Sequence, residues 1–201
     1  MLHYERGVEV TRRPWQRRIE VYSPKLRRRV TFLSQPAHEA WLLLESDPRV
    51  KQFCERPAYV EGRSGRAIDF WVSYGRHARF WMLSTDQAEH ATLPKTVEGL
   101  ALRIVRHEEL VAYAMRIENW SQIVPYLVSF ARHADGRLQQ DILARLEKPH
   151  RMERLEAAFH PMDNSMVRAA LFELLAAGKV VAPELDRAPL GINTVFKRAI
   201  G

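Results

Sequence analysis

The chain begins with alternating polar and apolar positions, the period expected of β-strands. Residues 17–22 and 29–33 both alternate, and the Ser23-Pro24-Lys25 segment between them is typical of a turn. An apolar helical face then runs over 37–46, and Asp47-Pro48 ends it. The pattern predicts a β-hairpin followed by an amphipathic helix.

Short strand-like runs separated by glycines follow this helix. They span residues 58–61, 67–72 and 79–83. A polar stretch over 85–96 predicts a surface loop, and 100–105 predicts another strand. We therefore expect an α/β (α+β) fold in which a mixed sheet is flanked by helices.

The second half of the chain is predominantly helical. Helices are expected over 108–114 and 118–132, with a domain boundary at Ala134-Asp135-Gly136. Beyond the boundary, the expected helices span 138–146, 151–159 and 164–177, with a helix stop at Gly178, and the expected strands span 179–182 and 193–197. Three helices and a hairpin in residues 137–201 indicate a small winged-helix domain after a first domain of residues 1–133.

Positive charge is concentrated at the N-terminal end of the chain. Residues 1–29 carry nine Lys or Arg against three acids, a local charge of +6 out of a net +7. Such asymmetry favours contact with a polyanion, usually nucleic acid, because each neutralised phosphate releases counterions. A solvated arm or a protein-docking segment is the alternative. The residues expected to contact DNA here are Arg12, Arg13, Arg17, Arg18, Lys25, Arg27, Arg28 and Arg29.

Length and composition indicate the number of domains and the cellular compartment of the protein. At 46% hydrophobic content, 201 residues suffice for one core, or for a medium domain with a small companion. The sequence contains neither an apolar run of about 18 residues nor a secretory pattern, so we expect no membrane partner. Cys54 is the only cysteine, which favours a cytoplasmic protein.

Two carboxylates are spaced as a metal-dependent nuclease could use them. Glu39 lies in the predicted helix, and Asp69 interrupts a later apolar run, where an unpaired charge would be costly. Mg²⁺ prefers hard oxygen ligands and can activate water beside a scissile phosphate, so two carboxylates from different elements make a minimal site. The alternative is that Glu39 is a solvated helix residue and Asp69 a strand-edge charge.

The strand after Asp69 lacks the remaining groups of such a site. An acid or amide and a lysine two residues apart would face the same side of a strand and add a ligand and a cation. The equivalent positions are Met82 and Ser84, and no lysine lies between Lys51 and Lys95. The frame is typical of a nuclease, but its chemistry is incomplete.

The ordered set of these features resembles the TnsA-like endonuclease subunits of heteromeric bacterial transposases. The resemblance covers nearly the whole chain, and its motifs are the Arg-rich hairpin, Ser34 with Glu39, Leu44-Glu-Ser-Asp-Pro-Arg-Val50, Phe53, Pro57, Ile68-Asp69-Phe70, Gly99-Leu-Ala-Leu-Arg-Ile-Val105 and the helix over 119–132. It implies a restriction-endonuclease-like core that cuts double-stranded DNA at the 5′ transposon ends with Mg²⁺. A DDE-type transposase that cuts the 3′ ends and an AAA+ regulator are the implied partners of this bacterial, nucleoid-associated protein.

The resemblance also assigns roles to individual positions. Glu39 matches the helix glutamate and Asp69 the metal-binding aspartate, which implies that both bind the metal and act in catalysis. Met82 falls where the family has an acid or glutamine, and Ser84 where it has the catalytic lysine. A methionine does not ligate Mg²⁺ usefully and a serine is no cation. We therefore expect a degenerate site with a DNA-binding and assembly role, in which Glu39 and Asp69 lie about 4–8 Å apart.

Two other functions stay open at this point. One is an active DNA endonuclease in which Arg79 or Lys95 supplies a relocated cation, and the other is a winged-helix DNA-binding regulator. In the winged helix, the 164–177 helix would be the recognition helix, although docking on a transposase partner is an equally open role. The residues of the second domain expected to contact phosphate are Arg168, which should project outward, Lys179, Lys197 and Arg198.

Overall fold

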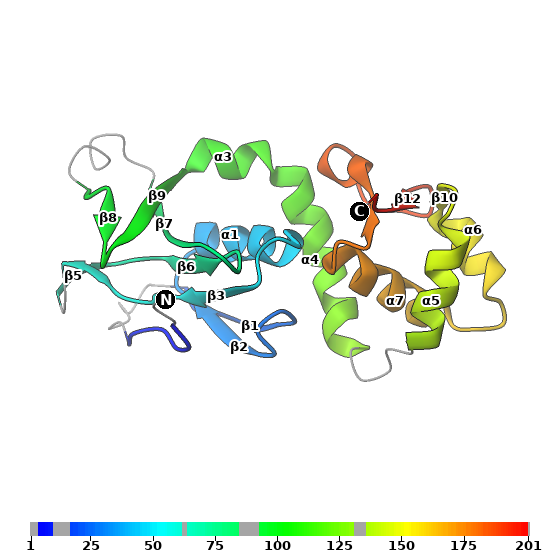
Figure 1. The fold of residues 1–201 in the computed structure, drawn as a ribbon, viewed down its shortest axis with the longest axis horizontal. Helices are drawn as coiled ribbons and strands as arrows, with labels where there is room; N and C mark the ends of the chain where they lie inside the picture. Colours follow the sequence, from blue (N-terminus) through cyan, green and yellow to red (C-terminus); the bar gives the residue numbers. More distant parts are fainter. Residues whose placement is uncertain (1–3, 10–16, 62–63, 85–92, 131–135, 201) are drawn as a thin grey trace. The chain divides into compact units, whose positions relative to one another are not determined.

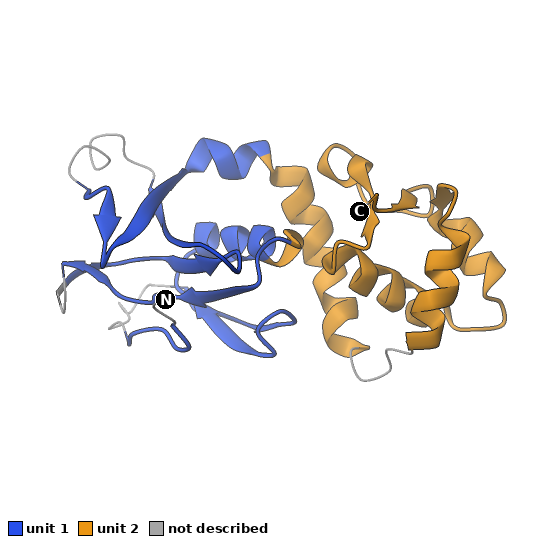
Figure 2. Ribbon diagram, viewed as in Figure 1, with its two compact units in different colours: residues 1–44, 49–112 blue, residues 45–48, 113–201 orange. Residues whose placement is uncertain are grey.

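The computed structural model describes residues 4–9, 17–61, 64–84, 93–130 and 136–200. The chain divides into two compact units, one of residues 1–44 and 49–112 and the other of residues 45–48 and 113–201 (Figure 2). The boundary expected at 134–136 falls partly on residues outside the described ranges, and the helix before it belongs to the second unit.

The first unit is built mainly from strands (Figure 1). Its elements are β1 (Ile19–Ser23), β2 (Arg28–Phe32), α1 (Gln35–Ser46), β3 (Gln52–Glu55), β4 (Tyr59–Glu61), β5 (Ser64–Ala67), β6 (Phe70–Ser73), β7 (Ala78–Ser84), β8 (Thr96–Val97), β9 (Leu100–Arg106) and α3 (His107–Ala112). β3 and β8 do not appear in the sequence-based prediction, because four and two residues are too few to show an alternating pattern.

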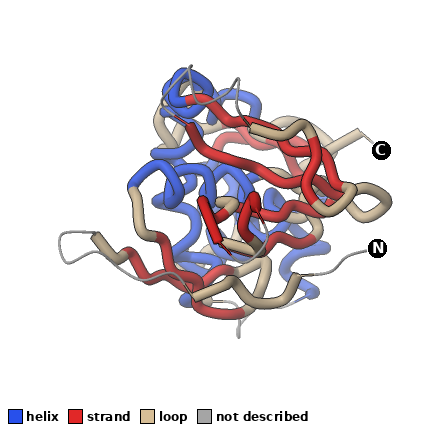
Figure 3. The backbone as a smooth tube through the Cα atoms, turned by 90° about the vertical axis from the view of Figure 1, so that its left-hand side faces the viewer, coloured by secondary structure: helices blue, strands red, loops and turns tan. Residues whose placement is uncertain are grey.

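Five of these strands form a central mixed sheet in the order β3-β6-β7-β9-β8. β3, β6 and β7 are antiparallel neighbours, β7 and β9 run parallel, and β8 returns antiparallel to β9. Figure 3, which colours strands red, shows the long strands of this unit running side by side. The expected mixed sheet flanked by helices is confirmed.

The predicted N-terminal hairpin is also confirmed. β1 and β2 pair antiparallel in a register that sets Ile19 opposite Phe32. Side chains two residues apart share one face of a strand, and Val30 and Phe32 on the inner face are each 1% exposed. Arg28 lies on this inner face as well, whereas its neighbour Arg29 lies on the outer face.

One face of the central sheet, here called the Phe70 face, packs against the hairpin and α1. The ring of Phe70 lies 5.9 Å from that of Phe32 and 6.4 Å from that of Phe53, and Phe32 lies 5.7 Å from Trp41 of α1. Full burial of an aromatic side chain contributes about 1.5–3 kcal/mol. This aromatic cluster therefore holds α1 and the hairpin on the sheet.

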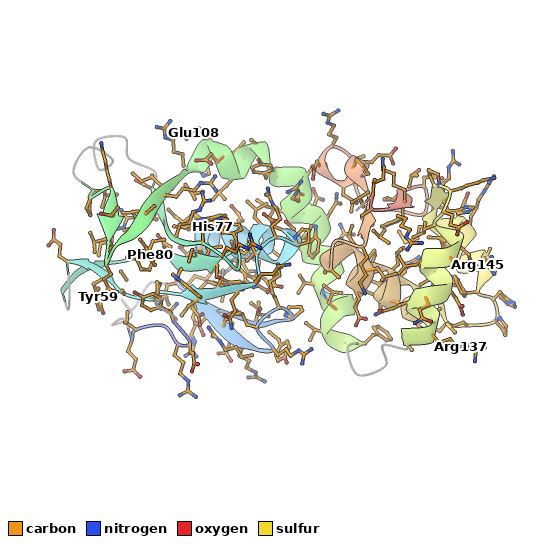
Figure 4. All side chains as sticks on the ribbon, viewed as in Figure 1. Tyr59, His77, Phe80, Glu108, Arg137 and Arg145 are labelled. Carbon is orange, nitrogen blue, oxygen red and sulfur yellow. The ribbon has the colours of Figure 1, made fainter. Side chains whose placement is uncertain are left out.

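The opposite face, here called the Trp71 face, carries a second apolar cluster. The ring of Tyr4 covers it, with centroids 5.7 Å from Trp71 and 5.6 Å from Phe80, which is labelled in Figure 4. The buried members of the cluster, each 8% exposed or less, are Cys54, Ile68, Trp71, Phe80, Met82 and Val97. The Trp71 face is therefore part of the protein interior.

The run 67–72, expected as one strand, contains a break. β5 pairs with β4, and β6 pairs with β3 after two residues, Ile68 and Asp69, that belong to neither strand. The N–H of Arg56 donates to the C=O of Asp69 at 2.9 Å. Apolar periodicity does not report a change of partner strand, so the break at Asp69 could not be predicted from the sequence.

The second unit combines helices with a small sheet. Its elements are α4 (Ala114–Ser129), α5 (Gly136–Arg145), β10 (His150–Arg151), α6 (Met152–Ala158), α7 (Asn164–Ala176), β11 (Val180–Val181), the 3-10 helix η2 (Pro183–Asp186) and β12 (Val195–Arg198). The three strands are antiparallel in the order β10-β12-β11. Arg145 of α5, which is labelled in Figure 4, stacks over the ring of Phe159 at 5.0 Å.

The helix stop predicted at Gly178 is confirmed. Gly178 has a φ of +72°, a conformation that side chains disfavour, and an added Cβ would lie 2.8 Å from the Cβ of Pro48. The tight turn then leads directly into β11.

The helices of the described ranges include none that is both long and apolar enough to cross a membrane.

Candidate functional site

Asp69 is the residue immediately before β6, so it lies at the end of the central sheet where this inner strand begins. Its Oδ2 accepts a hydrogen bond from the N–H of Leu83 on β7 at 2.7 Å. The ladder between the two strands ends at the pair Phe70–Trp81, so the half-buried carboxylate takes the place of the next ladder partner. Asp69 therefore stabilises the end of β7, a structural role that the sequence did not predict.

Arg66 of β5 reaches the same residue of β7. Its Nη2 donates to the C=O of Leu83. The N–H and the C=O of one strand residue point to the same side, so the Asp69 carboxylate and the Arg66 guanidinium meet at one edge of β7. Sequence reasoning missed Arg66, whose only signal is its place three residues before Asp69.

The two positions at which the resemblance would place an acid and a lysine, residues 82 and 84, are buried. Met82 is 0% exposed and Ser84 is 5% exposed. Both alternate with Leu83 on β7, and Met82 belongs to the cluster of the Trp71 face together with Cys54. Extending the register by one pair sets Met82 opposite Asp69. Core packing therefore occupies the face on which a nuclease of this kind would place its second ligand and its lysine.

Glu39 lies in the first turns of α1 and is half-buried. Its Oε1 accepts a hydrogen bond from Nε2 of Gln35 at 3.1 Å. Glu39 and Asp69 thus bind groups on different elements, and their expected separation of about 4–8 Å stays a prediction. Within the described ranges, no group of three His, Cys, Asp or Glu side chains is arranged to hold a metal ion.

The groups around Asp69 fit Mg²⁺ poorly. Oδ2 accepts an N–H, and the Arg66 guanidinium at the same strand edge would repel a dication. Magnesium binding by Glu39 and Asp69 therefore rests on the resemblance alone.

The two residues considered as relocated cations lie away from Asp69. Arg79 is three positions before Met82, the β7 residue opposite Asp69, about 10 Å along the strand. Its guanidinium stacks over the ring of Tyr74 at 5.0 Å. The C=O of Lys95 accepts from the N–H of Leu102 on β9, so Lys95 lies two strand spacings, about 10 Å, from β7. Arg66 is the better placed cation.

Burial favours the neutral forms of two titratable side chains in the first unit, Cys54 and His38. Burial raises the pKa of the Cys54 thiol to about 12, so this cysteine is not a nucleophile near pH 7. Burial also lowers the pKa of His38, the residue before Glu39, and favours its neutral imidazole.

Replacing Asp69 by alanine is expected to destabilise the first unit by about 1–3 kcal/mol, because the buried N–H of Leu83 would lose its acceptor. Asp69→Asn keeps an acceptor oxygen and should lose less than half as much. Urea unfolding of both variants measures the difference. If both variants unfold like the wild type, Asp69 does not support the end of β7.

Fewer basic side chains of the hairpin are exposed and unengaged within the fold than the sequence suggested. Arg12 and Arg13 lie outside the described residues. Arg17 and Arg27 are exposed, while Arg18 and Arg29 both bind Glu20, at 3.0 and 3.2 Å. Surface pairs of this kind contribute little to stability, so these guanidinium groups can exchange Glu20 for a phosphate. In the described part of the hairpin, the exposed arginines are therefore Arg17, Arg18, Arg27 and Arg29.

Two other basic residues of the hairpin are used within the fold. Nζ of Lys25 donates to the C=O of Leu44 near the end of α1, at 2.7 Å. Arg28 forms two hydrogen bonds with the carboxylate of Glu55, at 2.8 and 2.6 Å. Part of the positive charge that the sequence assigned to DNA thus stabilises the first unit.

In the second unit, the helix expected to read bases is largely covered. Every residue of α7 from Ser165 to Ala176 is buried or half-buried. Contrary to the expected outward projection, Nε of Arg168 donates to Oε1 of Glu156 at 2.5 Å and Nη1 contacts the hydroxyl of Tyr126 at 3.3 Å. The hydrogen bond to Glu156 raises the pKa of Arg168 further. This geometry leaves α7 little free polar surface for a DNA groove.

The basic residues near the C-terminus are more accessible. Lys179, Lys197 and Arg198 are all exposed. Because Arg198 is opposite the buried Val180, it shares the face of β12 that carries Phe196, whereas Lys197 lies on the other, outer face. Lys197 is therefore better placed than Arg198 to contact a phosphate.

Comparison of the chain with protein-family models and with curated proteins gives no match in either set.

Proposed function

We propose that this chain is a DNA-binding subunit of a TnsA-like transposase assembly and that its nuclease-like site does not cut DNA. The observation that carries the proposal is the burial of Met82 and Ser84 on β7, the two residues that the resemblance aligns with the acid and the lysine. Phosphodiester hydrolysis needs neutralised charge on the phosphate and an activated water. Asp69 alone, bound to the N–H of Leu83, supplies neither.

The central sheet supports the proposed nuclease-like frame. Three antiparallel strands, β3, β6 and β7, follow α1, and β9 then adds in parallel to β7. A restriction-endonuclease-like core of the kind that the resemblance implies is likewise a mixed sheet with flanking helices. The proposal takes the first unit to be such a core.

The order of elements in the second unit supports a winged-helix domain. Helices α5, α6 and α7 are followed by the hairpin of β11 and β12, which β10 extends to three strands. Because α7 is covered, we propose that this domain contacts the phosphate backbone or the transposase partner, and does not read bases.

An active endonuclease is the second candidate, and one observation favours it. The guanidinium of Arg66 meets Asp69 at the edge of β7, where a cation could stabilise a phosphate during cleavage. Arg66 replaces Arg79 and Lys95 as the residue to test for this role.

A cleavage assay on DNA with transposon ends distinguishes the two candidates. With Mg²⁺ or Mn²⁺ and its transposase, the purified chain should leave the 5′ ends uncut while the transposase cuts the 3′ ends. Asp69→Asn, which keeps an acceptor for Leu83, should change nothing. Cleavage of the 5′ ends by the wild type that is lost in Asp69→Asn and Arg66→Gln would establish the active enzyme instead.

Removing the outer arginines of the hairpin is expected to weaken duplex DNA binding. The double variant Arg27→Ala/Arg29→Ala loses up to two phosphate contacts, so the slope of log affinity against log salt should flatten by about 2. Fluorescence anisotropy at four or more salt concentrations measures the slope. Arg106→Ala, an exposed arginine at the end of β9, is the control. An unchanged slope in the double variant would assign the hairpin to protein docking.

A further inference from the structure

A cleft of about 350 Å³ lies in the first unit between the hairpin turn, the N-terminal segment and β3. Its cationic lining residues are Arg6 of the N-terminal segment and Lys25 and Arg28 of the hairpin. Gln52 of β3 adds a neutral amide, and Glu5 contributes a carboxylate. Cations thus surround the cleft from two separate parts of the chain.

Contacts within the unit hold the walls of this cleft in place. The N–H of Val8 donates to the C=O of Arg56 at 2.7 Å, and a Cβ added to Gly7 would lie 2.2 Å from the C=O of Glu55. The ring of Tyr4 packs on Trp71. The N-terminal segment that carries Arg6 is therefore fixed against the sheet by contacts that leave no room for a side chain at residue 7.

The lining favours an anion with several acceptor oxygens. Among the residues that line the cleft, three carry a positive charge and one, Glu5, carries a negative charge. Arg28 also binds Glu55, and Nζ of Lys25 also donates to the C=O of Leu44. Like charges gathered from separate segments repel one another, and a bound anion relieves the repulsion. Guanidinium, ammonium and amide groups together present the donors that phosphate oxygens accept.

We propose that this cleft binds a phosphate group. The phosphate belongs either to the DNA backbone, in which case the inference rests on the proposed function, or to a small phosphate-bearing molecule. The volume, about the lower limit for small-ligand pockets, admits a phosphate with an attached sugar. The hairpin turn that supplies Lys25 also exposes Arg27, the neighbour of Arg28, so a duplex bound to Arg27 lies within reach of the cleft.

Two substitutions probe the cleft with little effect on the fold. Arg6→Gln removes an exposed cation, and Gln52→Glu adds a carboxylate of the same shape at an exposed position. Arg106→Gln is the matched control, since it also removes one exposed arginine of the first unit. β9, which carries Arg106, lies three strand spacings, about 14 Å, from β3.

The first arm measures thermal unfolding of the full chain in 10 mM inorganic phosphate against chloride of equal ionic strength. Phosphate bound only to the folded protein raises its unfolding temperature. We expect this rise in the wild type and in Arg106→Gln, and its loss in Arg6→Gln and Gln52→Glu. The second arm measures binding to duplex DNA, where Arg6→Gln should flatten the salt slope by about 1 more than Arg106→Gln does.

The outcomes separate this inference from the proposed function. A response in the DNA arm assigns the cleft to a backbone phosphate, whether or not free phosphate also binds. A response in the phosphate arm alone, with no DNA binding by the wild type, supports the cleft as a small-phosphate site and overturns the proposed function. If both cleft variants behave like Arg106→Gln in both arms, the cleft does not bind phosphate.

Discussion

Replacing Arg28 by alanine is expected to destabilise the first unit by about 3–5 kcal/mol. Nη1 and Nη2 of Arg28 donate to the two carboxylate oxygens of Glu55, whose side chain is 7% exposed. The alanine variant would leave this carboxylate buried without its cation. Chemical denaturation measures the loss, and hydrogen exchange of the β3 and β6 amides locates it in the first unit.

Arg29→Ala is the matched control, because the side chain of Arg29 is 80% exposed and lies on the outer face of the same strand. It should change the free energy of unfolding by less than about 0.5 kcal/mol. The double variant Arg28→Met/Glu55→Leu should recover most of the stability, since apolar residues of similar size replace the pair. Equal effects of Arg28→Ala and Arg29→Ala would show that the buried pair contributes nothing.

Replacing Asn119 by alanine is the other substitution with a large expected effect, about 3–5 kcal/mol. The amide of Asn119 donates to the C=O of Leu185 and of Ala188, both at 2.8 Å, and accepts from the N–H of Leu190 at 2.7 Å. Asn119 is 0% exposed, and each buried group left without a partner costs about 1–3 kcal/mol. Denaturation of the variant measures the loss.

The segment joined to α4 by Asn119 should also become more dynamic. In Asn119→Ala, the amide of Leu190 should lose its hydrogen-exchange protection, because its acceptor is gone. Gln122→Ala is the control, since Gln122 is an exposed residue on the same helix. Unchanged protection at Leu190 would contradict the role of Asn119.

Elements with long and regular patterns were predictable from the sequence. The N-terminal hairpin, α1, α7 and the stop at Gly178 all appear close to their expected ranges. The sequence did not predict β3, β8 and β10, because strands of four or two residues depend on their partners for their conformation. Their hydrogen bonds are non-local, and no local pattern reports them.

The candidate site was predictable only in part. The absence of a lysine at residue 84 is visible in the sequence. The hydrogen bonds of Asp69 and Arg66 to Leu83 are not visible, because they join residues 14 and 17 positions apart at a break between two strands. The same is true of Arg168, whose partner Glu156 belongs to a different helix.

The sequence by itself determined that this protein has a basic N-terminal hairpin, a mixed α/β first part and a helical second part, because charge and periodicity are local properties. Tertiary structure alone decided which cations are free to bind a partner. Arg28 and Arg29 are adjacent and identical, yet one is paired with a buried carboxylate and the other lies on the surface. The physical reason is that a charge is held inside only where another segment brings a counter-charge within hydrogen-bonding distance, and the fold sets that distance.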